Sequence, residues 1–213
     1  KDQDMQSIAR EMNLSETTFV LPPGNIPVDF IVRIFTPEKE LPFAGHPTLG
    51  TAHILRETGK LLSGNYRIKF SMKSGIVTVV EGENENLLFM DQLLPDFHQT
   101  LNCAEEIGTA LGILTEDISL TDRPVQIVST GLPVLLVPVV SLKVLENIKV
   151  NNTKLRQFLS QLDADLIYTF TSQTFDENAT IHSRSFAPEL GISEDPATGS
   201  AAGATGAYLV KNK

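Results

Sequence analysis

Three polar side chains stand where the chain is expected to pass from one secondary-structure element to the next. Glu16 lies at an expected junction of a helix and a strand, where it is either a solvated loop carboxylate or a general acid/base. If that carboxyl is buried, its pKa is raised, which suits it to exchanging protons near neutral pH. His46 opens an expected helix, whose dipole disfavours imidazolium, so we predict a neutral imidazole that donates or accepts a hydrogen bond. Asp195 precedes a second expected helix start, where Asp is an ordinary N-terminal cap.

The two expected helix starts both carry glycine. The first reads Gly-His-Pro at 45–47 and the second reads Gly-Ser-Ala at 199–201. The first turn of a helix exposes unpaired N–H groups and the positive end of the dipole, so it binds anions. Two such starts in matched positions would grip one carboxylate. The alternative is that the glycines only permit tight turns and close packing.

The other candidates for chemistry have less support. His53 is expected to be a packed or satisfied histidine, and His98 and His182 have no partner at metal-ligand spacing. The sequence therefore predicts no metal site. Cys103 is the only cysteine, so it can form no intrachain disulfide and no zinc-binding pair. Ser200 lies outside a Gly-x-Ser-x-Gly elbow, which leaves a serine hydrolase as a poorly supported alternative.

The elements that must position these residues follow from periodicity and from Gly and Pro punctuation. Alternating or continuous apolar runs predict strands, and apolar residues at helical spacing predict helices. In the first part of the chain we expect a helix over 4–13, strands over 17–21, 29–36, 66–72, 76–80 and 87–93, and a helix over 47–58. In the second part we expect helices over 105–111, 142–148, 153–162 and 199–212, and strands over 125–129, 134–140, 165–170 and 180–186.

These elements predict two α+β halves, residues 1–97 and residues 98–213. The helices over 47–58 and 199–212 are poor in large side chains, so each needs close neighbours on all sides. We therefore expect two pseudo-symmetric halves, each a mixed β-sheet curled around one central helix.

Composition limits the class of protein. The chain has 213 residues, of which 41% are hydrophobic and 20% charged, which is ordinary globular usage. The net charge of −9 argues against a nucleic-acid or anionic-membrane partner. No apolar run approaches the ~18 residues that a membrane-spanning helix requires. We expect a soluble, cytoplasmic protein with a small-molecule partner.

Four segments together resemble the phenazine-biosynthesis-like family of isomerases and epimerases. They are residues 9–16, 35–47, 183–188 and 194–203, in the order and at the approximate spacing of that family, and the resemblance covers essentially the whole chain. It implies the fold of diaminopimelate epimerase, a site between the two halves, a small anionic substrate, a homodimer and proton transfer without a cofactor. The family has further strands before the position of Lys1 and after that of Lys213, so the fold is expected to be incomplete at both ends.

The resemblance also implies roles for particular residues. Glu16 would move a proton between two carbons, and His46 and Asp195 would orient the substrate and shuttle protons. The substrate carboxylate would be held by the Ser15 side chain and by backbone N–H groups around four residues: Gly45, His46, Gly199 and Ser200.

Two alternatives to an isomerase that uses Glu16 as its general acid/base bear on the function. A related epimerase chemistry uses two thiols where this chain has Ala44 and Thr198, so a two-cysteine racemase is excluded. The second alternative is a catalytically silent or regulatory member that only binds a small carboxylate.

Overall fold

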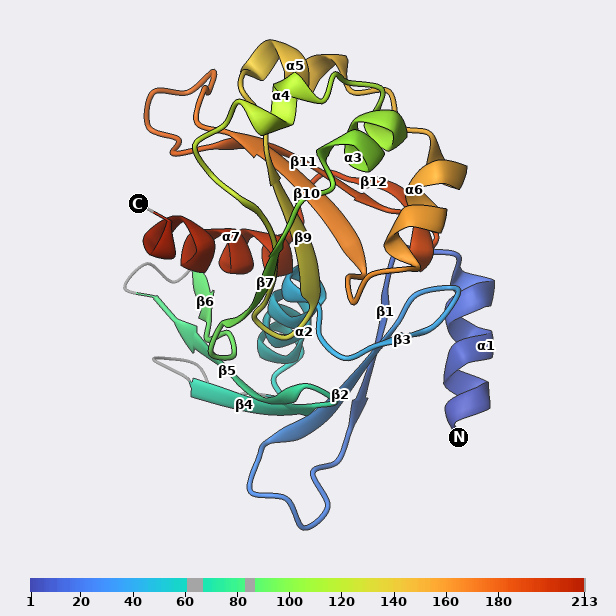
Figure 1. The fold of residues 1–213 in the computed structure, drawn as a ribbon. Helices are drawn as coiled ribbons and strands as arrows, with labels where there is room; N and C mark the ends of the chain where they lie inside the picture. Colours follow the sequence, from blue (N-terminus) through green and yellow to red (C-terminus); the bar gives the residue numbers. More distant parts are fainter. Residues whose placement is uncertain (61–66, 83–86, 213) are drawn as a thin grey trace. The chain divides into compact units, whose positions relative to one another are not determined.

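The computed structural model describes residues 1–60, 67–82 and 87–212, and the chain forms two compact units (Figure 1). Unit 1 is Lys1–Leu94 with Thr130–Leu132, and unit 2 is Pro95–Ser129 with Pro133–Lys213. Within the described ranges, each unit holds one six-stranded sheet that mixes parallel and antiparallel neighbours. The predicted α+β class with a mixed sheet in each half is confirmed. Along the chain, unit 1 gives way to unit 2 between Leu94 and Pro95, and the division into halves 1–97 and 98–213 stays a prediction.

The sheet of unit 1 has the order β1-β2-β4-β5-β6, with the short β3 beside β2. Strands β2 and β4 run parallel, and their neighbours pair antiparallel. Helix α2 packs against both β1 and β6, the two ends of this order, so the sheet curls around the helix. The elements are α1 (Asp2–Met12), β1 (Thr17–Leu21), β2 (Phe30–Phe35), β3 (Glu40–Leu41), α2 (Gly45–Glu57), β4 (Arg67–Met72), β5 (Gly75–Glu81) and β6 (Leu88–Met90).

The central helices bury polar side chains by bonding them to their own backbone. In α2, the hydroxyls of Thr48 and Thr51 donate to the carbonyls of Ala44 and Pro47, at 2.6 and 2.7 Å. In α7, Thr205 does the same to the carbonyl of Ala201, four residues earlier. Such bonds satisfy a hydroxyl without a partner from another element. They allow narrow, small-residue helices to be surrounded by a sheet.

The start of α2 differs slightly from the prediction. The helix begins at Gly45, two residues before the expected start at Pro47. The first four N–H groups of a helix have no intrahelical partner, so a proline within the first turn removes no hydrogen bond. Pro47 therefore fits inside the helix, and His46 becomes its second residue.

The sheet of unit 2 has the order β12-β11-β10-β9-β8-β7, with β9 and β10 parallel. Ile167 of β10 belongs to an apolar core with α3, α4, α5 and α6, whereas Phe170 contacts Tyr208 of α7 edge-on at 5.7 Å. Helices thus cover both faces, and β10 is buried throughout. The elements are β7 (Asp96–Leu101), α3 (Ala104–Leu111), α4 (Glu116–Ser119), β8 (Val125–Ser129), β9 (Pro133–Pro138), α5 (Leu142–Asn147), α6 (Asn152–Leu159), β10 (Leu166–Thr171), β11 (His182–Ala187), the 3-10 turn η1 (Pro188–Leu190), β12 (Ile192–Asp195) and α7 (Gly199–Lys211).

Several short elements were not predicted. Strands β3, β7 and β12 and helix α4 have no counterpart among the expected elements. The helix expected over 153–162 ends at Leu159, and the strand expected to end at 140 ends at Pro138. The expected strand start at Tyr66 lies outside the described residues.

Candidate active site

Glu16 and His46 lie together in unit 1. Asn13, in the left-handed conformation (φ 50°), ends α1, and three residues later Glu16 directly precedes β1. Oε2 of Glu16 lies 3.2 Å from Nε2 of His46. The Glu16 side chain is 8% exposed, whereas that of His46 is 50% exposed. A buried carboxylate therefore faces an imidazole that solvent can reach.

The expected raised pKa of Glu16 is wrong. Burial is the largest single influence on this carboxyl and raises its pKa, but hydrogen bonds from His46 and Ser15 and the charge of His46 together lower the pKa below its ordinary value. The prediction considered burial alone. Glu16 is therefore a carboxylate at neutral pH.

A pocket of about 460 Å³ surrounds this pair. One wall is β1 with its preceding residue, which contributes every second side chain: Glu16, Thr18 and Val20. The other wall is the start and one face of α2, which contributes His46, Pro47, Gly50, Thr51, Ile54 and Leu55. The pocket has a polar end at the carboxylate and an apolar lining beyond it. A small molecule with one ionic and one apolar part fits this division.

Sequence reasoning missed Thr18 and Thr51 as residues of this pocket. The Thr51 hydroxyl donates to the Pro47 carbonyl and lies 3.1 Å from the Thr18 hydroxyl. The signal was available, because Thr18 is two residues from Glu16 on a strand and Thr51 is four residues from Pro47 on a helix. Both spacings place side chains on the same face.

In unit 2, Asp195 organises the turn that leads into α7. Its Oδ2 accepts a hydrogen bond from the Thr198 hydroxyl at 2.6 Å, and its Oδ1 accepts one from the Ala197 N–H at 3.4 Å. Asp195 and Gly199 line a pocket of about 280 Å³ with seven other residues: Tyr168, Ser183, Ser185, Pro196, Ala197, Thr198 and Ala202. Ser200 is 4% exposed and is not among the residues that line this pocket.

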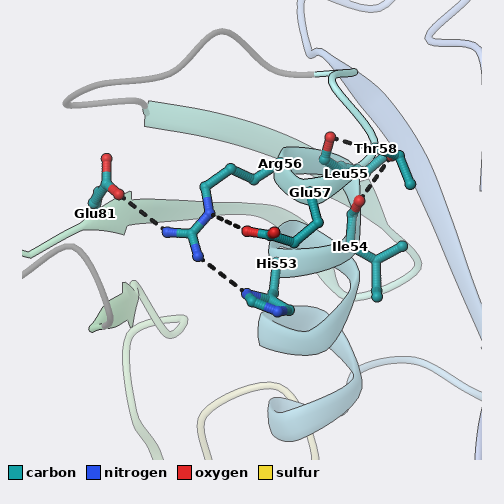
Figure 2. Close-up of polar contacts among 7 residues, drawn as sticks. All are labelled: His53, Ile54, Leu55, Arg56, Glu57, Thr58 and Glu81. Carbon is teal, nitrogen blue, oxygen red and sulfur yellow. Dashed lines mark hydrogen bonds and ion pairs between the residues drawn. The ribbon is translucent and has the colours of Figure 1, made fainter.

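The remaining histidines and the cysteine do not line either of the two pockets described above. His53 accepts a hydrogen bond from Arg56 at 3.2 Å (Figure 2), His98 lies 3.5 Å from Asp96, and His182 packs edge-on against a ring. Burial raises the pKa of the Cys103 thiol to about 11, so it is protonated at neutral pH. Across 1–60, 67–82 and 87–212, no group of three or more potential ligands could hold a metal ion. Within the same ranges, every helix is too short or too polar to cross a membrane.

Comparisons with known proteins identify the class. A hydroxyproline epimerase from Agrobacterium vitis shares the fold, with a TM-score of 0.66 at 12% identity over 92% of this chain and 60% of that one. The family model described as "Phenazine biosynthesis-like protein" matches residues 1–213, and the chain belongs to this family. Its enzyme class is isomerase.

Two relatives share substantially more of the sequence. Trans-2,3-dihydro-3-hydroxyanthranilate isomerase of Pseudomonas chlororaphis is 37% identical over 98% of this chain and 69% of its own length. The crystal structure of a PhzF-family phenazine biosynthesis protein from Bacillus anthracis has a TM-score of 0.83 and 34% identity, over 99% of this chain and 70% of that one.

Proposed function

We propose that this protein moves a proton between two carbons of a small carboxylate-bearing substrate without a cofactor, and that Glu16 is its general acid/base. The observation that carries the proposal is the contact of the buried Glu16 carboxylate with His46 inside a pocket. A carboxylate with little water around it is a suitable base for a carbon-bound proton. The name of the Pseudomonas relative describes an isomerase of a carboxylate-bearing ring, which supports the same class of substrate.

The lowered pKa of Glu16 defines the first step. Because the carboxyl is ionised at neutral pH, the free enzyme presents a base, and the first event is removal of a proton from carbon. The hydrogen bonds that lower its pKa come from His46 and Ser15. When a substrate carboxylate accepts the hydrogen bond of the Ser15 hydroxyl in place of Glu16, one of the contacts that lower the pKa of Glu16 is lost. The effect of burial then weighs more, and the pKa of Glu16 rises. The carboxyl then holds the proton and returns it to the second carbon.

Donors for the substrate carboxylate are proposed at both central helix starts. Neither Ala44 nor Thr198 caps its helix with a side-chain hydrogen bond. We assign the backbone N–H groups around Gly45, His46, Gly199 and Ser200, together with the Ser15 side chain, to the carboxylate. We assign His46 and Asp195 to orienting the substrate and to moving protons. A homodimeric assembly likewise stays a prediction.

Proton exchange tests the role of Glu16 directly. The protein is incubated in deuterated water with trans-2,3-dihydro-3-hydroxyanthranilate and with a panel of small cyclic and amino-acid carboxylates, and deuterium incorporation at carbon is followed by NMR. For any compound that the wild type exchanges, Glu16→Gln is expected to lower the rate at least ~100-fold, because loss of a general base costs about 10²–10⁴.

The matched control is Glu11→Gln, which changes an exposed carboxylate at the end of α1. It should exchange at the wild-type rate. Exchange retained in folded Glu16→Gln would contradict the role of Glu16. If the wild type binds a carboxylate but exchanges no compound, this result would contradict the proposed isomerase activity. It would indicate a catalytically silent protein that only binds small carboxylates.

A further inference from the structure

An Arg-x-Phe-x-Pro segment occurs once in each unit, and in unit 1 its arginine forms a clamp. Arg33 of β2 donates through Nε and Nη2 to both carboxylate oxygens of Glu40 on β3, at 2.7 and 2.9 Å. The guanidinium lies 5.1 Å from the centre of the Phe35 ring. Its third arm, Nη1, donates to Asp2 in the first turn of α1. All three arms of the guanidinium are therefore used.

Unit 2 repeats this clamp. Arg184 of β11 donates through Nε and Nη2 to both oxygens of Glu194 on β12, again at 2.7 and 2.9 Å. The guanidinium lies 5.0 Å from the centre of the Phe186 ring. Its Nη1 also ends on a helix, at the carbonyls of Leu145 and Ile148 at the end of α5. Recurrence of the same three-armed arrangement indicates a built feature rather than a chance surface pair.

The clamped glutamate has the same place in both units. Glu40 precedes Gly45, the first residue of α2, by five residues, and Glu194 precedes Gly199, the first residue of α7, by five residues. A bidentate Arg–carboxylate pair fixes both distance and orientation. Each clamp therefore anchors the segment that delivers a central helix start.

In unit 1 the clamp also reaches the segment that delivers Glu16. Arg33 binds Asp2 at one end of α1, and the Gln6 side chain donates to the carbonyls of Thr36 and Pro37 in the turn after β2. The far end of α1 leads through a short link to Glu16. Arg33 thus joins two chain segments, of which one ends at Glu16 and the other at His46.

We infer that Arg33 is a positioning residue that sets the alignment of Glu16 with His46. It acts through Glu40 and α1 and touches no reacting atom. The Arg33 and Glu40 side chains are 22% and 19% exposed, so water competes little for the pair. The inference rests on the proposed function for the importance of this alignment, but its test needs neither a substrate nor activity.

The test measures the pKa of Glu16 by NMR titration of 13C-labelled glutamate side chains, with Glu16→Gln to assign the signal. The variants are Arg33→Met, Arg33→Lys and Glu40→Gln. Arg67→Met is the control, because it removes an exposed arginine of the same unit, which lies 3.8 Å from the exposed Asp91 carboxylate. If the hydrogen bond from His46 weakens, burial prevails and the pKa of Glu16 rises by about one unit.

Glu40→Gln is the decisive variant because position and charge act in opposite directions. Loss of the Glu40 charge leaves the Arg33 charge unbalanced, and the electrostatic field of that change alone lowers the pKa of Glu16. A rise in Glu40→Gln therefore supports a loss of alignment. Arg33→Lys keeps the positive charge but cannot form the two parallel hydrogen bonds to the Glu40 carboxylate, so it should raise the pKa of Glu16 as well. Arg67→Met should leave that pKa within about 0.2 units of wild type, since exposed charges are screened.

An unchanged or lowered pKa of Glu16 in folded Glu40→Gln would overturn the inference and leave Arg33 a structural residue. If Arg33→Met does not fold, Glu40→Gln and Arg33→Lys still decide. Failure of the positioning role and failure of the proposed function give different results. A raised pKa of Glu16 in Glu40→Gln, in a protein whose wild type exchanges no compound, refutes only the proposed function. Exchange lost in Glu16→Gln with no pKa change in Glu40→Gln refutes only the positioning role.

Discussion

An ion pair between Arg56 of α2 and Glu81 of β5 offers a quantitative test of how the central helix is held in unit 1 (Figure 2). Nη1 of Arg56 lies 3.1 Å from Oε1 of Glu81, and the two side chains are 18% and 7% exposed. Removing one member of a buried pair leaves the other charge desolvated, which costs about 3–5 kcal/mol. We expect Arg56→Met to lower the free energy of unfolding by about 3 kcal/mol, because it leaves the charge of Glu81, the more buried of the two side chains, without this partner.

The reverse substitution should cost less. Arg56 also lies 3.2 Å from the Glu57 carboxylate and 3.2 Å from the His53 ring nitrogen, so it keeps partners after Glu81→Met. We expect Glu81→Met to lower the free energy of unfolding by about 1–2 kcal/mol. The double variant should lower it by about the same amount, since apolar side chains then replace both charges. The coupling energy of the double-mutant cycle is then about 3 kcal/mol.

Urea denaturation at neutral pH measures the four free energies of unfolding. With a slope of about 2 kcal/mol per molar, the Arg56→Met midpoint falls by about 1.5 M. Glu57→Gln is the matched control, because its carboxylate is 56% exposed, and it should change stability by less than about 0.5 kcal/mol. A coupling energy below about 0.5 kcal/mol would refute the reasoning, because the pair would then behave as a solvated surface pair.

Other perturbations test packing, the thiol and the carboxylates. Gly131→Ala should cost about 2 kcal/mol in urea denaturation, because Gly131 has φ +127° and a Cβ there would lie 3.0 Å from the Phe43 ring; an unchanged midpoint would contradict this. Cys103 should react with iodoacetamide at neutral pH at least ~10-fold more slowly than free cysteine, since burial raises its pKa to about 11; labelling at the free rate would argue against that environment. The pKa values of Glu16 and Glu194 are lowered by folding, so their stabilisation is complete above the unfolded value of 4.5 and is lost as pH falls through the folded values. Urea midpoints should therefore fall below about pH 4.5, and Glu194→Gln should flatten that fall; a wild-type slope in this variant would contradict the shift.

The sequence predicts the central features of the fold because they follow from local pattern. Small residues along 47–58 and 199–212 require surrounding neighbours, and α2 packs against both ends of its sheet. Strands β7 and β12 escaped prediction, since Asp96–Leu101 and Ile192–Asp195 are polar and partly exposed. They are edge strands of a sheet whose hydrogen-bond ladder, rather than their own side chains, holds them.

The candidate site is predictable in residue type but not in electrostatics. Glu16 and His46 stand at element boundaries that the sequence indicates, and the structure brings their side chains to 3.2 Å. The sign of the pKa change depends on that approach, which no local pattern contains. The clamp of Arg33 is also only partly predictable. The repeated Arg-x-Phe-x-Pro motif is visible in the sequence, but Glu40 is identified as the partner of Arg33 only by the pairing of β2 with β3.

The turn Thr130–Leu132 has a consequence for the order of folding. These three residues belong to unit 1, where the Thr130 hydroxyl donates to the Gln92 side chain at 2.5 Å and Gly131 lies against Phe43. During synthesis, the ribosome must add residues 95–129, which belong to unit 2, before this turn emerges. Unit 1 therefore cannot complete its core when its own first 94 residues have left the exit tunnel. The turn joins the paired strands β8 and β9, so the last residues of unit 1 to be synthesised lie within a hairpin of unit 2.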